Sequence, residues 1–273
     1  MSSVGRGVGR AVPTADRGTL PEPQVRAMFD RIARVYDLMN SVMTAGMHHR
    51  WRRRAADLAA VGPGDRVLDV ATGTGDLAIE LGRRVRPDGA VVGSDFSDEM
   101  LARARTKLAG LSLDAERASA ARARTKVAGR SAALGAGIRF EWGNALELPY
   151  DDDEFAAATV GFGARNFSDL EQGLREMTRV VRPGGKVVVL EITTPQKPPL
   201  STFFSLWFDR VVPLIGKVAG DSDAYDYLPN SVKRFPGPDG LAATMERAGL
   251  ARIRWILTAG GIIALHVGTK PDA

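Results

Sequence analysis

The chain has 273 residues and a formal net charge of +5, and 44% of its residues are hydrophobic. This length suits one α/β domain, and no apolar run approaches the roughly eighteen residues that a membrane-spanning helix needs. The absence of cysteine excludes disulfides, a thiol nucleophile and a cysteine-ligated metal, and it favours a cytoplasmic protein. Aromatic and basic residues do not interleave as a nucleic-acid surface requires, so we expect no nucleic-acid partner.

The N-terminal part changes character near residue 24. Residues 1–23 are rich in Gly, Arg, Ser, Thr and Pro, which predicts a disordered arm ahead of a single domain over residues 24–273. Residues 24–60 are predicted to form a helical cap, because apolar residues recur there at helical spacing, among them Val25, Met28, Phe29 and Ile32. The cap packs against the domain, forms a lid over a ligand site, or does both.

The stretch VLDVATGTGDL, residues 67–77, predicts a buried strand, a tight turn at Gly73 and Gly75, and the start of a helix. Such a turn brings backbone N–H groups close to a ligand. A second apolar run ends at Asp95, whose carboxylate can accept two hydrogen bonds from a ribose diol. The unit therefore predicts a pocket for an adenosine-type ligand. It does not separate NAD from other ligands, because the G-x-G-x-x-A dinucleotide pattern also fits.

The rest of the chain predicts further strands that alternate with helices. Strands are expected at Ile138–Trp142, Phe155–Val160 and Lys186–Ile192, and a hairpin at Ala251–Leu257 and Ile262–Val267. Alternation of this kind predicts a Rossmann-like α/β fold, with a seven-stranded doubly wound sheet whose last strand is antiparallel.

Two segments stand apart from this pattern. Ala102–Gly110 and Ala121–Gly129 read ARARTKLAG and ARARTKVAG, a duplication that predicts a surface insertion over residues 109–137 and suggests no function. Residues 198–235 are predicted to form an apolar helix, rich in aromatic residues over Phe203–Val212, followed by a polar lid loop. The aromatic helix belongs to the core, or it lines an apolar tunnel or faces a membrane.

Three functions compete at this point: a nicotinamide oxidoreductase, an S-adenosylmethionine methyltransferase and a non-catalytic adenine-nucleotide binder. The sequence contains no P-loop and no G-x-S-x-G elbow, and no His, Asp or Glu cluster has metal-ligand spacing, so we predict no metal site. The lone His266 of the last strand is expected to be a packed core residue. The methyltransferase hypothesis explains more, because Asp69, Asp95 and Asn144 each end or follow a predicted strand.

Longer motifs resemble the menaquinone/ubiquinone-biosynthesis C-methyltransferase family. They are FDRIARVYDLMNSVMTAGMHHRWRR, VLDVATGTGDLA, GNALELPYDDDEFAAATVGFGARN, EMTRVVRPGGKVVVLEITTP, and YLPNSVKRFPGPDGL with AGGIIALHVGTK. The resemblance implies a class I S-adenosylmethionine methyltransferase that methylates the ring of a demethylmenaquinol, a 2-polyprenyl-1,4-naphthoquinol. A polyprenyl benzoquinol is the alternative substrate.

The resemblance also implies site residues. The implied cofactor contacts are Thr74, Asp95, Asn144, Ala145 and Gly161, with Asp69, Gly73 and Gly75 completing the set. Gly161 stands where the family often has serine, so only a backbone contact is expected there. For catalysis we expect Arg165 and Tyr36 to help the quinol hydroxyl lose its proton, with Arg165 as a positive neighbour that lowers the hydroxyl's pKa. Asp37, Asn166 and His49 are further candidates.

A polyprenyl tail requires an apolar channel or access to a bilayer. The basic run of Arg50, Arg52, Arg53 and Arg54 beside Trp51 suits an anionic membrane. Peripheral contact with the inner face of the cell membrane is therefore a hypothesis, and the sequence does not predict an oligomeric state.

Overall fold

The computed structural model describes residues 22–44, 46–123, 137–195, 198, 202, 206 and 222–272. Nearly all of the predicted N-terminal arm, most of the aromatic segment 203–212 and the second copy of the duplication beyond Ala123 lie outside these ranges. No helix within the ranges combines the length and the apolar character that crossing a membrane requires.

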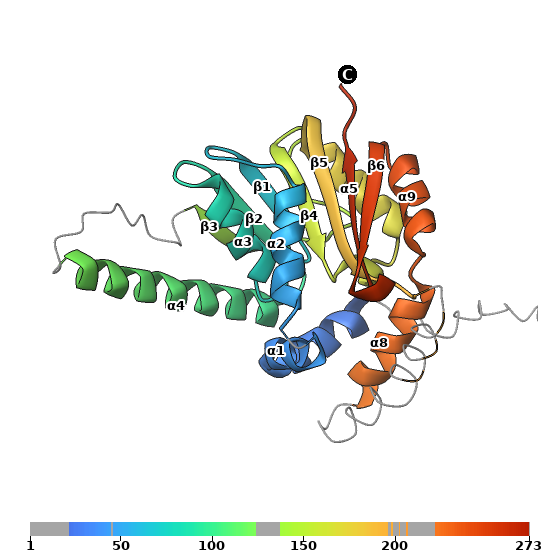
Figure 1. Cartoon of the computed structure of the whole chain (residues 1–273), viewed down its shortest axis with the longest axis horizontal. Helices are drawn as coiled ribbons and strands as arrows, with labels where there is room; N and C mark the ends of the chain where they lie inside the picture. The colour runs from blue at the N-terminus through green and yellow to red at the C-terminus, as the bar shows by residue number, and fades with distance from the viewer. Residues whose placement is uncertain are drawn as a thin grey trace, which may run out of the picture.

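A seven-stranded mixed sheet forms the centre of the molecule, which confirms the predicted fold class (Figure 1). The strands are β1 (Arg66–Val70), β2 (Ala90–Asp95), β3 (Ile138–Trp142), β4 (Phe155–Gly161), β5 (Val181–Ile192), β6 (Ala251–Thr258) and β7 (Ile263–Thr269), in the order β3-β2-β1-β4-β5-β7-β6. Strands β1 to β5 are parallel, and β7 pairs antiparallel with both β5 and β6. From β1 the chain adds β2 and then β3 on one side of β1, and it later adds β4 and β5 on the other side. Ligands of open α/β sheets bind where the order reverses in this way, at the carboxyl ends of the strands.

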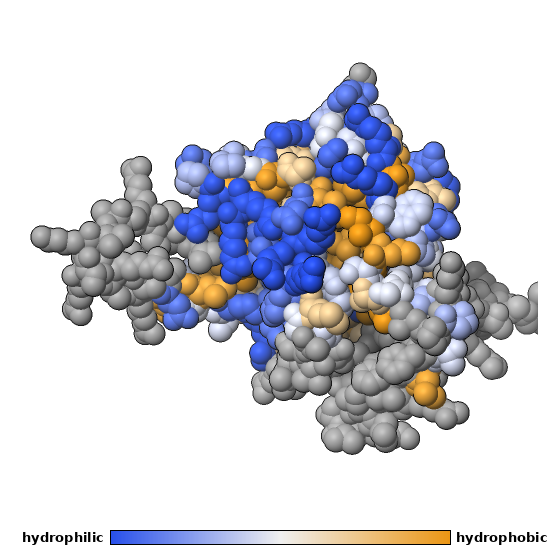
Figure 2. Space-filling view, viewed as in Figure 1, coloured by the Kyte–Doolittle hydropathy of each residue, from blue (hydrophilic) through white to orange (hydrophobic). Residues whose placement is uncertain are grey.

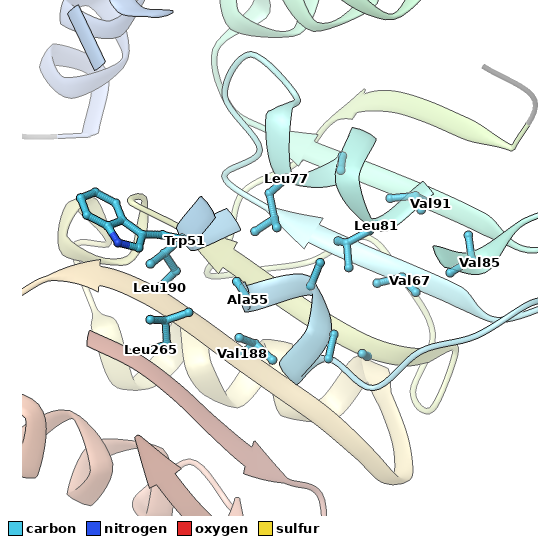
Figure 3. Packing of buried hydrophobic residues seen from close by; sticks show 14 of the residues in the cluster. Trp51, Ala55, Val67, Leu77, Leu81, Val85, Val91, Val188, Leu190 and Leu265 are labelled. Carbon is cyan, nitrogen blue, oxygen red and sulfur yellow. The ribbon is translucent and has the colours of Figure 1, made fainter. Parts of the chain in front are cut away.

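Helices cover both faces of the sheet, and strand residues alternate between two cores. The helices are α1 (Glu22–Thr44), α2 (His48–Leu58), α3 (Asp76–Val85), α4 (Asp98–Ala123), α5 (Leu170–Val180), α8 (Ser222–Arg234) and α9 (Pro238–Arg247), with short turns η1 (Ala164–Asn166) and η3 (Ala259–Gly261). Adjacent residues of β1, Val67 and Leu68, belong to different cores, as the period of two of a strand requires. Trp51 of α2 and Leu81 of α3 pack in the first core with Val67 (Figure 3).

Two segments differ from the prediction. Residues 222–234, expected within a polar loop, form α8 in spite of the internal Pro229. Tyr227 and Val232 of this helix are buried, which provides packing that its polar sequence does not predict. Strand β5 begins at Val181, because Val181 pairs with Phe155 before the register shifts.

The long helix α4 carries the whole first copy of the duplication. Its Ala104 is fully buried in the first core, and Arg105 Nη2 donates to the carbonyl of Phe140 at 2.8 Å. The second copy begins only at Ala121, close to the end of the helix. The first copy is thus part of the sheet's cover.

His266 of β7 is a packed core residue. Its side chain is fully buried, its ring stacks on Trp255 at 5.5 Å between centroids, and Nε2 lies 2.9 Å from the carbonyl oxygen of Pro238. Burial lowers the pKa of His266 to about 4 from the usual 6.5.

The variant His266→Gln is expected to change how stability depends on pH. The folded state keeps His266 neutral while the unfolded state binds a proton below pH 6.5, so this histidine costs stability as pH falls from 6.5 to 4. The free energy of unfolding of the wild type, relative to that of the variant, should fall by up to about 3 kcal/mol over this window. Urea denaturation at several pH values measures it, and a difference that does not vary with pH would contradict the assignment.

Candidate functional site

A pocket opens at the carboxyl ends of β1, β2, β3 and β4. Its walls come from the loops that follow these strands and from the end of η1 with the residues after it. They are Ala71–Thr74, Phe96, Gly143–Leu146, Phe162–Gly163 and Asn166–Ser168. The helices contribute Phe29 of α1, Arg52 of α2, Leu77 of α3 and Met100 of α4. The pocket therefore lies at the point where the strand order reverses, as an α/β fold predicts.

Most of the predicted cofactor residues meet in this pocket. Its lining includes Asp69, Gly73, Thr74, Asp95, Asn144, Ala145 and Gly161. Gly75 precedes α3 outside the lining, with φ at 82°, and a Cβ there would lie 2.6 Å from the ring of Phe140. The role of each of these residues in holding a cofactor stays a prediction.

Asp95 joins the loop after β1 to the loop after β2. Its Oδ2 accepts a hydrogen bond from the Gly73 N–H at 2.8 Å, and its Oδ1 accepts one from the Ser97 N–H at 2.9 Å. Burial raises the pKa of Asp95 to about 6, and the N–H donors oppose that rise. The carboxylate is therefore ionised at neutral pH and retains lone pairs that ribose hydroxyls can use.

Asp69, at the end of β1, is a second buried carboxylate. It accepts hydrogen bonds from the hydroxyls of Thr72 and Thr159, both at 2.6 Å. Burial raises the pKa of Asp69 to about 6, while these hydroxyls and the charge of Arg52 oppose the rise. Two carboxylates thus border the pocket at neighbouring strand ends.

Two further observations suit a bound ligand. A Cβ built on Gly73 meets no atom within 4 Å, so this loop faces open space. The Oδ1 atom of Asn166 is buried and has no hydrogen-bond partner in the described part of the chain. A ligand with hydroxyl or amine donors would satisfy such an atom.

The five catalytic candidates lie in different surroundings. Asn166 lines the pocket, and Arg165 does not. The Arg165 side chain is 7% exposed, and its Nη1 lies 2.6 Å from Oε1 of Glu191, so it is not a surface charge. His49 borders a separate cavity beside α2. Tyr36 belongs to α1, and its side chain lies outside the described part of the structure.

Asp37 belongs to a polar node that ties α1 to the glycine loop. Its Oδ1 accepts a hydrogen bond from the Thr74 hydroxyl at 2.6 Å, and its Oδ2 lies 2.6 Å from Lys107 Nζ. Lys107 also donates to Thr74 at 3.0 Å and to Asp76 at 2.7 Å. Burial alone would raise the pKa of Asp76, but the charges of Arg52 and Lys107 outweigh it and hold that pKa below its usual value.

One cluster has the composition of a metal site, although the sequence predicts none. Ligand atoms of His48, His49 and Asp76 lie within 4.8 Å of one another. Both Asp76 oxygens already face cations, however, with Lys107 Nζ at 2.7 Å and Arg52 Nη1 at 2.9 Å. A metal ion would have to displace these cations, so we assign no metal here.

Sequence reasoning missed Arg52 and Lys107. A signal for Arg52 exists, because the buried residues of α2 recur at helical spacing and include Trp51, Arg52, Ala55 and Ala56. Lys107 carries no such signal, since its contacts with Asp37 and Asp76 arise only when α1, α3 and α4 come together.

Residues 18–270 match the ubiE/COQ5 methyltransferase family. The chain belongs to this family. A demethylmenaquinone methyltransferase of Thermus thermophilus is 43% identical over 245 residues, which span 89% of this chain and 100% of the relative. A ubiquinone/menaquinone biosynthesis C-methyltransferase of Teredinibacter turnerae is 38% identical and spans 90% of this chain and 91% of that one.

Solved structures of low sequence identity share the fold. A SAM-dependent methyltransferase from Aquifex aeolicus superposes with a TM-score of 0.53 at 16% identity, covering 80% of this chain and 89% of that one. Membership of the ubiE/COQ5 methyltransferase family confirms the predictions of a methyltransferase and of S-adenosylmethionine as its cofactor, and it removes the nicotinamide oxidoreductase alternative.

The variant Lys107→Ala is expected to weaken binding of S-adenosylhomocysteine about tenfold, because it releases Thr74 and α1 from the node and because charge-assisted hydrogen bonds contribute on this scale. Titration calorimetry measures the affinity. Lys126 holds the same place in the second copy of the duplication and provides the control, Lys126→Ala. Equal losses in the two variants would refute a specific role for Lys107.

Proposed function

We propose that this chain transfers the methyl group of S-adenosylmethionine to a ring carbon of a demethylmenaquinol. The observation that carries the proposal is the pocket at the ends of β1, β2 and β4, in which the glycine loop meets Asp95 and Asn166 within a chain of the ubiE/COQ5 methyltransferase family. The relative named demethylmenaquinone methyltransferase, which the alignment spans over its whole length, supports the naphthoquinol ring. The relative named for both quinones keeps a polyprenyl benzoquinol as the alternative.

The residues of the chain suit this chemistry. S-adenosylmethionine supplies a methyl group on a positively charged sulfur, and a quinol that has lost its hydroxyl proton supplies the nucleophilic carbon. As the new C–C bond forms, the C–S bond breaks and S-adenosylhomocysteine is released. The hydrogen on the methylated ring carbon then moves as a proton to the quinol oxygen, which restores the aromatic ring. Charge is neutralised as the methyl group moves, so a pocket from which water is excluded favours the reaction. Phe29, Phe96 and Phe162 provide apolar walls of this kind.

We propose that Asn166 is the polar group that meets the quinol hydroxyl, since its buried Oδ1 is an acceptor without a partner in the described structure. Arg165 belongs to η1, the same short turn as Asn166, and stabilises it. Its Nη1 donates to the Phe162 carbonyl and to Glu191, both at 2.6 Å, which holds η1 against β5. Arg165 would then act by its charge and by placing Asn166.

Tyr36 stays a second proposed catalytic residue. The next residue, Asp37, lies 2.6 Å from the Thr74 hydroxyl, so α1 reaches the glycine loop at this point of the chain. Tyr36 is therefore supported by its place on α1 alone.

Purified protein incubated with labelled S-adenosylmethionine and reduced demethylated quinones is expected to label the naphthoquinol ring in preference to the benzoquinol ring. Asn166→Leu keeps the approximate size of the side chain and removes the acceptor for the quinol hydroxyl. It should lower kcat by about tenfold to a hundredfold with little change in S-adenosylhomocysteine affinity. Label in neither quinol ring would refute the proposed function, and label in the benzoquinol alone would establish the alternative.

We also propose that the chain contacts an anionic membrane through one side of α2. Arg50, Arg53 and Arg54 are exposed there, whereas Trp51 and Arg52 are buried, so these two do not contribute as the sequence suggested. The exposed arginines share a groove with Ile256 of β6, which is 38% exposed. Figure 2 shows a hydrophilic patch over α2 beside a hydrophobic strip. Basic and apolar surfaces side by side suit a lipid interface.

The double variant Arg50→Gln, Arg54→Gln is expected to weaken binding to anionic vesicles, by about fivefold for each arginine removed. Flotation at low salt measures the bound fraction. Arg175→Gln is the control, because this exposed arginine lies on α5. Wild-type protein that does not float with anionic vesicles at low salt would contradict the membrane proposal and leave the methyl transfer untouched.

A further inference from the structure

Arg52 is the one cationic side chain among the described residues that line the pocket. It is 7% exposed, in the middle of α2. A buried charge is costly unless a group of opposite charge or a set of hydrogen bonds compensates it. The surroundings of Arg52 therefore indicate what the pocket is built to hold.

The described chain uses little of the hydrogen-bonding capacity of Arg52. Its Nη1 lies 2.9 Å from Oδ2 of Asp76, an ion pair, yet this buried nitrogen donates no hydrogen bond of good geometry in the described structure. Asp76 also pairs with Lys107 at 2.7 Å, so its charge is shared. The guanidinium lies 5.7 Å from the ring centroid of Phe162, another residue of the pocket wall. A guanidinium has five donors in a planar fork that matches a carboxylate.

A buried anion borders the same end of the pocket. Asp69 lines it and is 1% exposed, and two threonine hydroxyls fill only part of its acceptor capacity. The charge of Arg52 acts on Asp69, since it lowers the pKa of that carboxyl. The positive charge of Arg52 and the negative charge of Asp69, both on the pocket wall, are complementary to a zwitterionic group of a ligand.

The order of the strands indicates which part of the cofactor would lie near Arg52 and Asp69. Asn144 follows β3, Asp95 ends β2 and Asp69 ends β1, and these three strands are adjacent in the sheet. S-adenosylmethionine is a linear molecule with adenine, ribose, sulfonium and amino acid in succession. If Asn144 and Asp95 take the adenine and the ribose, the amino-acid end reaches the Asp69 side of the pocket, where Arg52 lies.

We propose that Arg52 binds the α-carboxylate of the cofactor's amino-acid portion. This inference rests on S-adenosylmethionine as the cofactor and is independent of which quinol is methylated. It assigns to α2 a direct part in cofactor recognition, whereas the competing role for Arg52 is that of a strut that holds Asp76 and the start of α3.

Two ligands separate these roles. S-adenosylhomocysteine carries the amino-acid end, and 5′-methylthioadenosine is the same adenosine thioether without it. Titration calorimetry of both ligands is carried out with the wild type, Arg52→Gln, Arg52→Lys and Arg83→Gln. Arg83 is the matched control, because it is an arginine on α3 that pairs with Glu80 and lies outside the pocket lining.

Arg52→Gln is expected to weaken S-adenosylhomocysteine about tenfold to a hundredfold and to leave 5′-methylthioadenosine within about twofold of the wild type. Arg52→Lys should recover part of the loss, since it keeps the charge without the planar fork. Arg83→Gln should change neither affinity.

Equal weakening of both ligands by Arg52→Gln would show the strut role and overturn the proposal, as would no weakening of either ligand. Wild-type protein that binds neither ligand would overturn the cofactor site itself. The expected pattern of affinities, combined with no label in any quinol, would uphold the role of Arg52 and refute the proposed methyl acceptor.

Discussion

The pocket depends on one buried carboxylate. Asp95 receives the N–H groups of Gly73 and Ser97, and so it fastens the loop after β1 to the loop after β2. Helix α1 is anchored to the same two loops, by Asp37 on the Thr74 hydroxyl and by Asp30 on the Ser97 hydroxyl at 2.5 Å. A single ionised group with two backbone donors therefore sets the geometry of the glycine turn, and through it the position of the helix that covers the site. Loss of the charge of Asp95 would therefore change the loop after β1, the loop after β2 and the position of α1.

The sheet could be predicted closely because its strands are short apolar runs between glycine and proline turns. Ile138–Trp142 forms β3 with the predicted bounds, and the predicted antiparallel hairpin appears as β6 and β7. The failures have a common cause in long-range packing. Helix α8 contains Pro229 and many polar residues, so local preference favours a loop, whereas burial of residues such as Tyr227 and Val232 in the folded chain favours the helix.

The site residues likewise fall into those that could be predicted from the sequence and those that depend on long-range packing. Residues at strand ends, such as Asp69 and Asn144, could be placed in one pocket from sequence, because parallel strands bring their carboxyl ends to a common edge. Arg52 was grouped with its exposed neighbours, although its helical phase matches that of buried Trp51 and Ala55. Lys107 could not be predicted at all, since its three partners come from α1, the glycine loop and α3. A local sequence pattern does not predict contacts between side chains of elements that are far apart in the chain.

The duplication in α4 has a geometric consequence. A shift of nineteen residues along an α-helix is about five and a quarter turns, which displaces the second copy by roughly 28 Å and rotates it by about 100°. The stretch that begins at Ala121 therefore repeats the letters of Ala102–Gly110 out of phase with the helix. Ala123, which corresponds in the second copy to the buried Ala104, is the last residue of α4. A repeat in the sequence is therefore not a repeat in the phase of the helix.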